Sequence, residues 1–73
     1  MNEYVVIFEQ GETNWGAIVP DLPGCVSIGA TMEEAEKNVR EAIELYIEEL
    51  RSEGEPIPQP KHRIGSVMID VAS

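Results

Sequence analysis

The side chains best suited to chemistry are few in this sequence and lie far apart. His62 is the only histidine and Cys25 the only cysteine. A general base needs a nucleophile or a carboxylate beside it in a cleft, whereas His62 lies in the basic stretch Lys61–Arg63, after a proline-rich segment. We interpret His62 as a solvated loop residue or a partner contact. We interpret Cys25 as a small packed side chain, because no neighbour in sequence would lower its pKa.

The acidic residues offer no recognisable metal site. Two-metal nucleases need clustered carboxylates, but Glu9, Asp21, Glu41 and Asp70 are scattered along the chain. One cysteine and one histidine are too few for a four-ligand zinc site. The sequence therefore predicts a protein that is not an enzyme, with no catalytic residue, no metal and no cofactor. A metal-dependent nuclease is the weakest of three functional hypotheses.

Composition restricts the class of partner. The chain has 14 acidic and 5 basic residues and a net charge of −9, which repels phosphate backbones and anionic membranes. There is no apolar run long enough to span a bilayer and no secretory signal after Met1. With a single thiol, these features predict a cytoplasmic protein that binds neither nucleic acid nor membrane directly.

The length predicts one domain, residues 1–73, with a thin core. A domain of this size commonly needs a disulfide, a metal or association for stability. A single cysteine forms no internal disulfide, and the metal has no ligand set, so association is what remains.

Four extended runs are expected, over residues 4–10, 15–19, 25–30 and 66–72. Residues 4–10 are rich in β-branched and aromatic side chains, and residues 66–72 alternate apolar and mostly polar positions. Turn residues 11–14 separate the first two runs. The second and third flank a rigid loop built from Pro20, Asp21, Leu22, Pro23 and Gly24.

One helix is expected from Thr31 to about Arg51. Thr31 and Glu34 have the spacing of a capping box, and Gly54 provides a stop. Apolar side chains recur every three or four positions on one stripe. They are Ala35, Val39, Ala42, Ile43, Tyr46, Ile47 and Leu50.

The order βββαβ predicts an α+β fold with a four-stranded mixed sheet in the order 3-2-1-4 and the helix on one face, because the crossover to the last strand should be right-handed. The first strand would then be central. Tyr4, Val6 and Phe8 would point to one face, and Val5 and Ile7 to the other. Since one helix covers one face only, the second apolar face is predicted to meet another polypeptide.

Several further residues are candidate contacts with a partner or a second copy. Trp15 is either a core residue or an exposed anchor, and Leu45 lies off the apolar stripe. The segment Thr31–Glu55 has nine acidic and three basic residues, a net charge of −6. It is either a solvated face or a surface that steers a basic partner. The full candidate set is Tyr4, Val6, Phe8, Trp15, Leu45, Glu41, Glu44 and Glu48.

Four motifs in this order resemble HicB-like antitoxins over nearly the whole chain. They are AIVPDLPGCV (residues 17–26), GATMEEA (29–35), EAIELY (41–46) and GEPIP (54–58). The resemblance implies a partial ribonuclease H-like fold of the same βββαβ order. It also implies a partner, a small basic HicA-like toxin that cleaves mRNA and is neutralised by protein contact. Ribonuclease H activity does not follow from the fold, because its grouped carboxylates are not recognisable here.

The sequence departs from the family pattern at its end. Many HicB antitoxins continue into a C-terminal DNA-binding segment, whereas this chain ends at Ser73. We therefore expect no direct operator binding. The alternative function is a stand-alone homo-oligomer, a dimer or a tetramer, without a toxin or with an unknown regulatory role.

Overall fold

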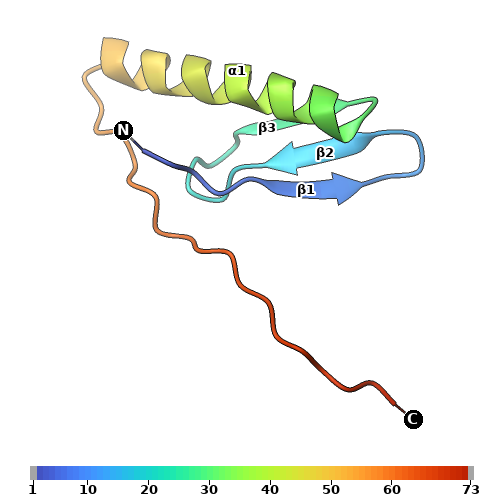
Figure 1. Cartoon of the computed structure of the whole chain (residues 1–73). Coiled ribbons are helices and arrows are strands. Elements are labelled where there is room, and N and C mark those ends of the chain that lie inside the picture. The colour runs from blue at the N-terminus through green and yellow to red at the C-terminus, as the bar shows by residue number, and fades with distance from the viewer. Residues whose placement is uncertain (1, 73) are drawn as a thin grey trace.

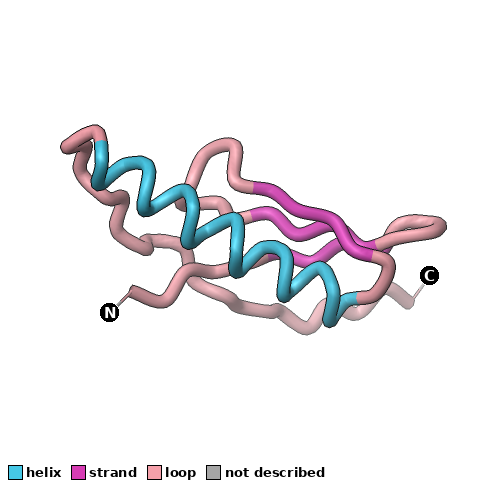
Figure 2. The backbone as a smooth tube through the Cα atoms, turned by 90° about the horizontal axis from the view of Figure 1, so that it is seen from above, coloured by secondary structure: helices cyan, strands magenta, loops and turns pink. Residues whose placement is uncertain are grey.

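The computed structural model describes residues 2–72 and contains one sheet and one helix. The strands β1 (Ile7–Gln10), β2 (Trp15–Ile18) and β3 (Val26–Gly29) form an antiparallel sheet in the order β1-β2-β3. The helix α1 (Met32–Ser52) runs along the strands and packs on one face of the sheet (Figure 1). Seen from above, it crosses the sheet as a single second layer (Figure 2).

The predicted four-stranded sheet in the order 3-2-1-4 is wrong. The described residues form a three-stranded sheet, and residues 66–72 are an extended, exposed segment that pairs with no strand. Beyond its contacts with Asp21, at Lys61 and His62, the chain leads away from the sheet (Figure 1). β1 is therefore an edge strand and not a central one.

The error has a physical reason. Alternation in residues 66–72 indicates a segment able to form a strand, but a strand exists only through pairing and packing against its neighbours. The same is true at the other end of the chain, where residues 4–6 were expected to be strand. They are extended but precede the first paired residue, Ile7.

Strand register separates the two faces of the sheet. Phe8 pairs with Ala17, and Ala17 pairs with Ser27. Successive residues of a strand point to opposite faces, so the buried Ala17 and the half-buried Phe8 lie on the helix side. Ile7, Ile18 and Val26 form the adjacent cross-strand row on the other face, where all three are exposed.

Both ends of α1 are capped by local hydrogen bonds. Thr31 is the N-cap, and its hydroxyl accepts a bond from the Glu34 amide at 3.1 Å. The Glu34 carboxylate accepts from the amide of Ala30 at 3.2 Å, one residue earlier than in a standard capping box. At the other end Gly54 has φ +72°, and the Glu55 amide donates to the Leu50 carbonyl, as in a Schellman motif. Across residues 2–72 no helix has the length and hydrophobicity of a membrane span.

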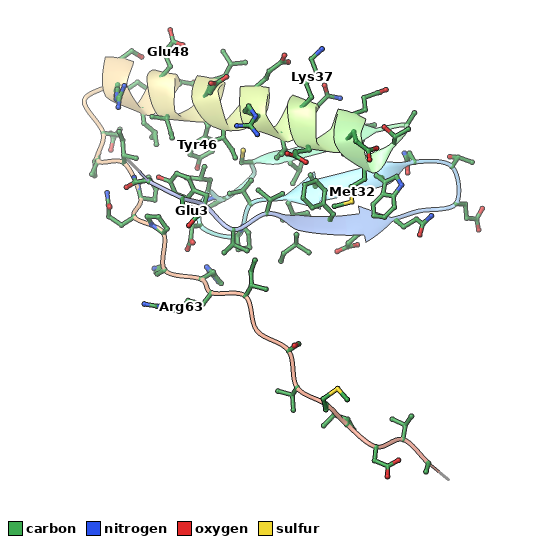
Figure 3. All side chains as sticks on the ribbon, in the orientation of Figure 1. Glu3, Met32, Lys37, Tyr46, Glu48 and Arg63 are labelled. Atoms are coloured by element: carbon green, nitrogen blue, oxygen red, sulfur yellow. The ribbon has the colours of Figure 1, made fainter. Side chains whose placement is uncertain are left out.

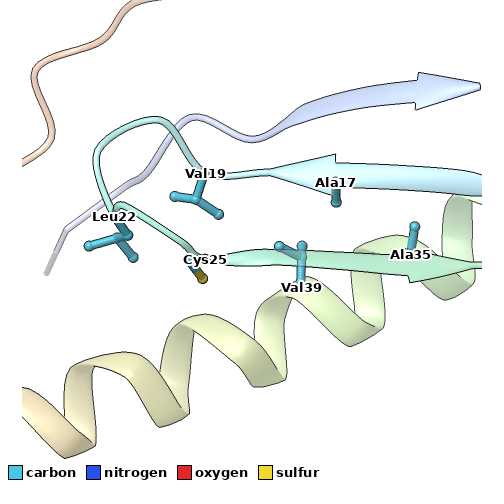
Figure 4. Close-up of a cluster of buried hydrophobic side chains, with 6 residues drawn as sticks. All are labelled: Ala17, Val19, Leu22, Cys25, Ala35 and Val39. Carbon is cyan, nitrogen blue, oxygen red and sulfur yellow. The ribbon is translucent and has the colours of Figure 1, made fainter.

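The core lies between α1 and the strands β2 and β3, with a large contribution from the loop at 20–24. Its buried side chains are Ala17, Val19, Leu22, Cys25, Ala35 and Val39 (Figure 4). The loop folds inward because the amides of Leu22 and Cys25 donate to the carbonyls of Val19 and Leu22, and Gly24 supplies a positive φ of 81°. Burial raises the pKa of the Cys25 thiol, as expected for a packed side chain.

Candidate functional site

The candidate contact residues do not form one surface. Tyr4, Val6, Phe8 and Glu44 line a groove between α1, the chain leading into β1, and the segment after the proline connector. We call it the β1 groove. Its complete lining is Asn2, Glu3, Tyr4, Val5, Val6, Phe8, Glu36, Val39, Arg40, Ile43, Glu44, Pro60, Lys61, His62, Arg63 and Ile64.

The β1 groove combines an apolar floor with a charged rim. Tyr4, Val6, Phe8 and Ile43 are half-buried and pack against the core. The rim carries both signs of charge, since three of the five Lys and Arg residues of the chain lie there beside Glu36 and Glu44. The 3.6 Å pair between Arg40 and Glu36 is well exposed and contributes little to stability. This arrangement suits an extended segment with an apolar side.

A second surface lies on the other flank of α1. Glu41, Leu45 and Glu48 follow the i, i+4, i+7 spacing of one helix face, and we call this face the acidic flank. Leu45 is 66% exposed and lines a shallow depression with Glu48, Glu49 and Ser52. Glu48 points away from the sheet (Figure 3). The acidic flank presents an apolar side chain surrounded by carboxylates.

Trp15 belongs to neither surface. It begins β2, pairs with Gln10 and Gly29 across the sheet, and packs half-buried against the core. Trp15 therefore lies on the helix side of the sheet, where it is a partly buried residue at the edge of the core.

The far face of the sheet exposes a patch of β-branched side chains. Ile7, Ile18, Val26 and Ile28 are between 39% and 65% exposed, and we call them the open sheet face. Ile18, Val26 and Ile28 were not among the candidate contacts from the sequence. The alternation of apolar residues in β2 and β3 is compatible with such a patch, but only the strand register shows that these side chains share one face.

Sequence reasoning also missed the role of Asp21. The residue is 5% exposed, and its carboxylate accepts hydrogen bonds from the amides of Lys61 and His62, at 3.0 and 3.1 Å. Its second oxygen lies 2.6 Å from Nδ1 of His62. Tyr4 adds a bond from its hydroxyl to the carbonyl of Pro58 at 2.5 Å. These contacts, here called the Asp21 clamp, hold residues 58–62 at one end of the β1 groove.

No metal site assembles from the candidate acids. Among residues 2–72 no group of three or more His, Cys, Asp or Glu side chains is arranged to hold an ion. Asp21 is engaged in the clamp, and Asp70 accepts from the amide of Ala72 at the other end of the structure.

The Asp21 clamp should open in acid. Burial raises the pKa of Asp21, but the hydrogen bonds from the His62 side chain and from the Lys61 and His62 amides outweigh it, so the pKa lies below its ordinary value of 3.8. Because the pKa of Asp21 is lower in the folded state, its carboxylate stabilises the clamp at pH values above 3.8. This stabilisation is lost as the pH falls through the lowered pKa. At neutral pH we expect the amides of Lys61 and His62 to be strongly protected from hydrogen exchange, relative to an unstructured chain at the same pH, and we expect this protection to be lost in that acid range.

Asp21→Asn is the matched variant, because it keeps one acceptor oxygen and removes the titrating group. It should weaken protection of the two amides at neutral pH and abolish the acid transition. An identical transition in the variant, or unprotected amides in the parent protein at neutral pH, would contradict the clamp.

Comparison with known proteins identifies relatives. A family model described as the HicB-like antitoxin of bacterial toxin–antitoxin systems matches residues 4–70. A UPF0150 protein of Synechocystis sp. is 47% identical over 57 residues, covering 77% of this chain and 72% of the relative. A UPF0150 protein of Thermoplasma acidophilum is 43% identical over 58 residues, covering 78% and 84%.

A named antitoxin is also similar over most of the chain. Antitoxin HicB 2 of Photorhabdus laumondii is 33% identical over 72 residues, which is 93% of this chain and 48% of the relative, so this chain spans about half of that protein. No solved structure matches. The matched range 4–70 contains the acidic flank, the Asp21 clamp and all residues of the β1 groove except Asn2 and Glu3. The resemblance in the motifs is confirmed, and the chain belongs to the HicB-like antitoxin family of bacterial toxin–antitoxin systems.

Proposed function

We propose that this protein is an antitoxin that neutralises a small, basic, HicA-like mRNA-cleaving toxin by direct protein contact. The observation that carries the proposal is the family match over residues 4–70. It acts by binding, without chemistry of its own and without touching nucleic acid directly, in keeping with its net charge of −9. Because the toxin's substrate is mRNA, the pair works in the cytoplasm.

The acidic flank is the surface that we assign to the toxin. Carboxylates at Glu41 and Glu48 attract a basic partner over a long range and raise its association rate. Leu45, exposed between them, supplies the apolar centre that interfaces place inside a polar rim. The flank is formed by the middle of a capped helix, so it is rigid before binding. Little conformational entropy is therefore lost on association.

Co-expression tests the function itself. The toxin candidate to test is any small basic protein that an adjacent open reading frame encodes. We expect it to arrest growth alone, and we expect this antitoxin to restore growth and to co-purify with it. The proposal is rejected if this antitoxin neither restores growth nor co-purifies with the toxin candidate.

Substitutions on the acidic flank test the assigned surface. Leu45→Arg should weaken toxin binding at least about tenfold, the effect of losing a central contact and adding a like charge. Glu48→Lys should slow association and reduce the salt dependence of binding. Glu12→Lys makes the same charge change in the exposed hairpin loop and serves as the control. Titration calorimetry and stopped-flow mixing measure both effects, and equal losses for Glu48→Lys and Glu12→Lys would remove the flank from the interface.

Self-association is a second proposal, favoured by the open sheet face. Ile7, Ile18 and Val26 form one exposed apolar row with no cover from the helix, and such patches mark interfaces. A homodimer or homotetramer would bury this row, either beside the antitoxin role or as a stand-alone assembly. Light scattering at micromolar concentration measures the state directly, and a strict monomer would contradict it.

A further inference from the structure

The outer edge of β3 points away from the rest of the sheet. Among residues 2–72, β3 pairs with β2 only. The amide of Val19 donates to the carbonyl of Cys25, so these two residues are a hydrogen-bonded pair at the end of the β2–β3 ladder. Such pairs alternate along an antiparallel ladder. The amides and carbonyls of Val26 and Ile28 therefore face away from β2, and so does the amide of Ala30. We call these groups the β3 edge.

Two groups of the β3 edge already have partners on α1. The side-chain amide of Asn38 donates to the carbonyl of Ile28 at 2.8 Å, and the carboxylate of Glu34 accepts from the amide of Ala30 at 3.2 Å. Glu34 and Asn38 are four positions apart, so they lie one helical turn apart on the same face of α1. The helix thus supplies one donor and one acceptor to β3, in the way that a neighbouring strand would.

The close approach of the helix to β3 makes these contacts possible. A Cβ at Gly29 would lie 2.4 Å from the amide nitrogen of Ala35, so the absence of a side chain lets the first turn of α1 come this near. The Glu34 carboxylate accordingly bonds at the strand edge and not to the N-cap amide that a capping box would use.

The rest of the β3 edge is short and apolar. Val26 and Ile28 are β-branched and are 59% and 65% exposed, and exposed edges of this composition readily pair with other strands. If the carbonyl of Ile28 and the amide of Ala30 were free, the open edge would cover residues 26–30, which is enough for a paired strand. With both groups occupied, only residues 26–28 remain open.

We propose that Glu34 and Asn38 keep the β3 edge closed to pairing with the β3 edge of a second copy. Without them, two such edges related by a two-fold axis would form one antiparallel sheet across both copies. Covering an edge is one way in which proteins avoid edge-to-edge association. The inference goes beyond the proposed functions, because neither toxin binding by the acidic flank nor association through the open sheet face requires it.

Removing both contacts should open the β3 edge. Glu34→Ala combined with Asn38→Ala should raise the self-association constant of the full chain at least about tenfold, because each copy regains one donor and one acceptor for pairing. Glu34→Gln combined with Asn38→Gln is the matched control. It has the same net charge as the alanine pair but keeps an acceptor and a donor at these positions, so its constant should stay within about threefold of the parent value. Light scattering over a dilution series measures all three proteins.

Hydrogen exchange identifies the edge that pairs. In the parent protein the amides of Ser27 and Gly29, which face β2, should be protected, and those of Val26 and Ile28 should not. In the alanine pair the amides of Val26 and Ile28 should become protected as the protein concentration rises. A helix start that is only less stable would lower protection and would not add it at these two amides.

Asn38→Ala alone separates opening of the edge from damage to α1, because it keeps the contacts of Glu34 and Thr31 at the helix start. It should raise association by a smaller factor, with unchanged helical circular dichroism. Equal association constants for the alanine and glutamine pairs would overturn the proposal. Association of the alanine pair that disappears with Ile18→Asp would overturn it too, because the interface would then be the open sheet face and the self-association proposal would stand.

Discussion

Replacing Gly29 by alanine should lower the free energy of unfolding by about 1–3 kcal/mol, the typical cost of overpacking a rigid site. A Cβ at this position would lie 2.4 Å from the amide nitrogen of Ala35 and 2.8 Å from the carbonyl carbon of Glu34. Both are backbone atoms in the first turn of α1, so no side chain can rotate away. The methyl group can be accommodated only if the helix lifts from β3 and opens the core around Ala35.

Gly16→Ala is the matched control. Gly16 also lies inside a strand, yet a Cβ there would meet nothing within 4 Å. It should be neutral or slightly stabilising, because alanine restricts the unfolded chain more than glycine does. Urea unfolding followed by circular dichroism gives both values. Equal midpoints for the two variants would contradict the close approach of α1 to β3.

The helix and the three strands could be predicted because their signals are local. Thr31 and Gly54 mark the ends of the helix in sequence, and both cap it in the structure. The turn after Gln10 is closed by the amide of Gly11, which donates to the carbonyl of Asn14 at 2.7 Å. Each of these features depends on residues no more than five positions apart.

The fourth strand could not be predicted correctly because its existence depends on distant partners. Alternation in residues 66–72 indicates that a strand can form but not what it pairs with. The two-faced apolar pattern of residues 4–8 led to a central position for the first strand. An edge strand that faces a groove has the same apolar pattern, so the sequence alone did not distinguish an edge strand from a central one.

The candidate site was predicted only in part for a similar reason. The helical period separates Leu45 from the core stripe, and the structure exposes it. Asp21 appeared to be one of several scattered acids because its partners, Lys61 and His62, are 40 and 41 residues away. A buried carboxylate requires donors, but nothing in the sequence shows that Asp21 is buried.

The loop at 20–24 connects the core to one end of the β1 groove and to the middle of α1. Asp21 accepts hydrogen bonds from the amides of Lys61 and His62. The carbonyl of Pro23 accepts a bond at 3.0 Å from the hydroxyl of Tyr46, which points from α1 towards the sheet (Figure 3). Between them Leu22 is fully buried beside Val19 and Cys25 (Figure 4). Leu22 therefore fixes a loop that holds Lys61 and His62 on one side and contacts the middle of α1 on the other.

Leu22→Ala should consequently remove a large share of the stability of this small domain. Truncating a fully buried leucine costs about 2–5 kcal/mol, whereas about 4–11 kcal/mol is the whole free energy of unfolding expected for a chain of this length. Leu45→Ala is the matched control, because the same atoms are removed from a side chain that is 66% exposed, and its cost should stay within about 0.5 kcal/mol. Urea unfolding measures both variants.

The variants Leu22→Ala and Leu45→Ala together distinguish effects on folding from effects on toxin binding. Leu45→Ala should unfold like the parent protein and still bind the toxin more weakly. Leu22→Ala should unfold at much lower urea and lose amide protection at Lys61 and His62, because the loop that carries Asp21 loses its anchor in the core. If both leucine variants unfolded at the parent midpoint, the loop would not be part of the core. If Leu45→Ala alone were unstable, Leu45 would be a packing residue and the acidic flank would lose its apolar centre.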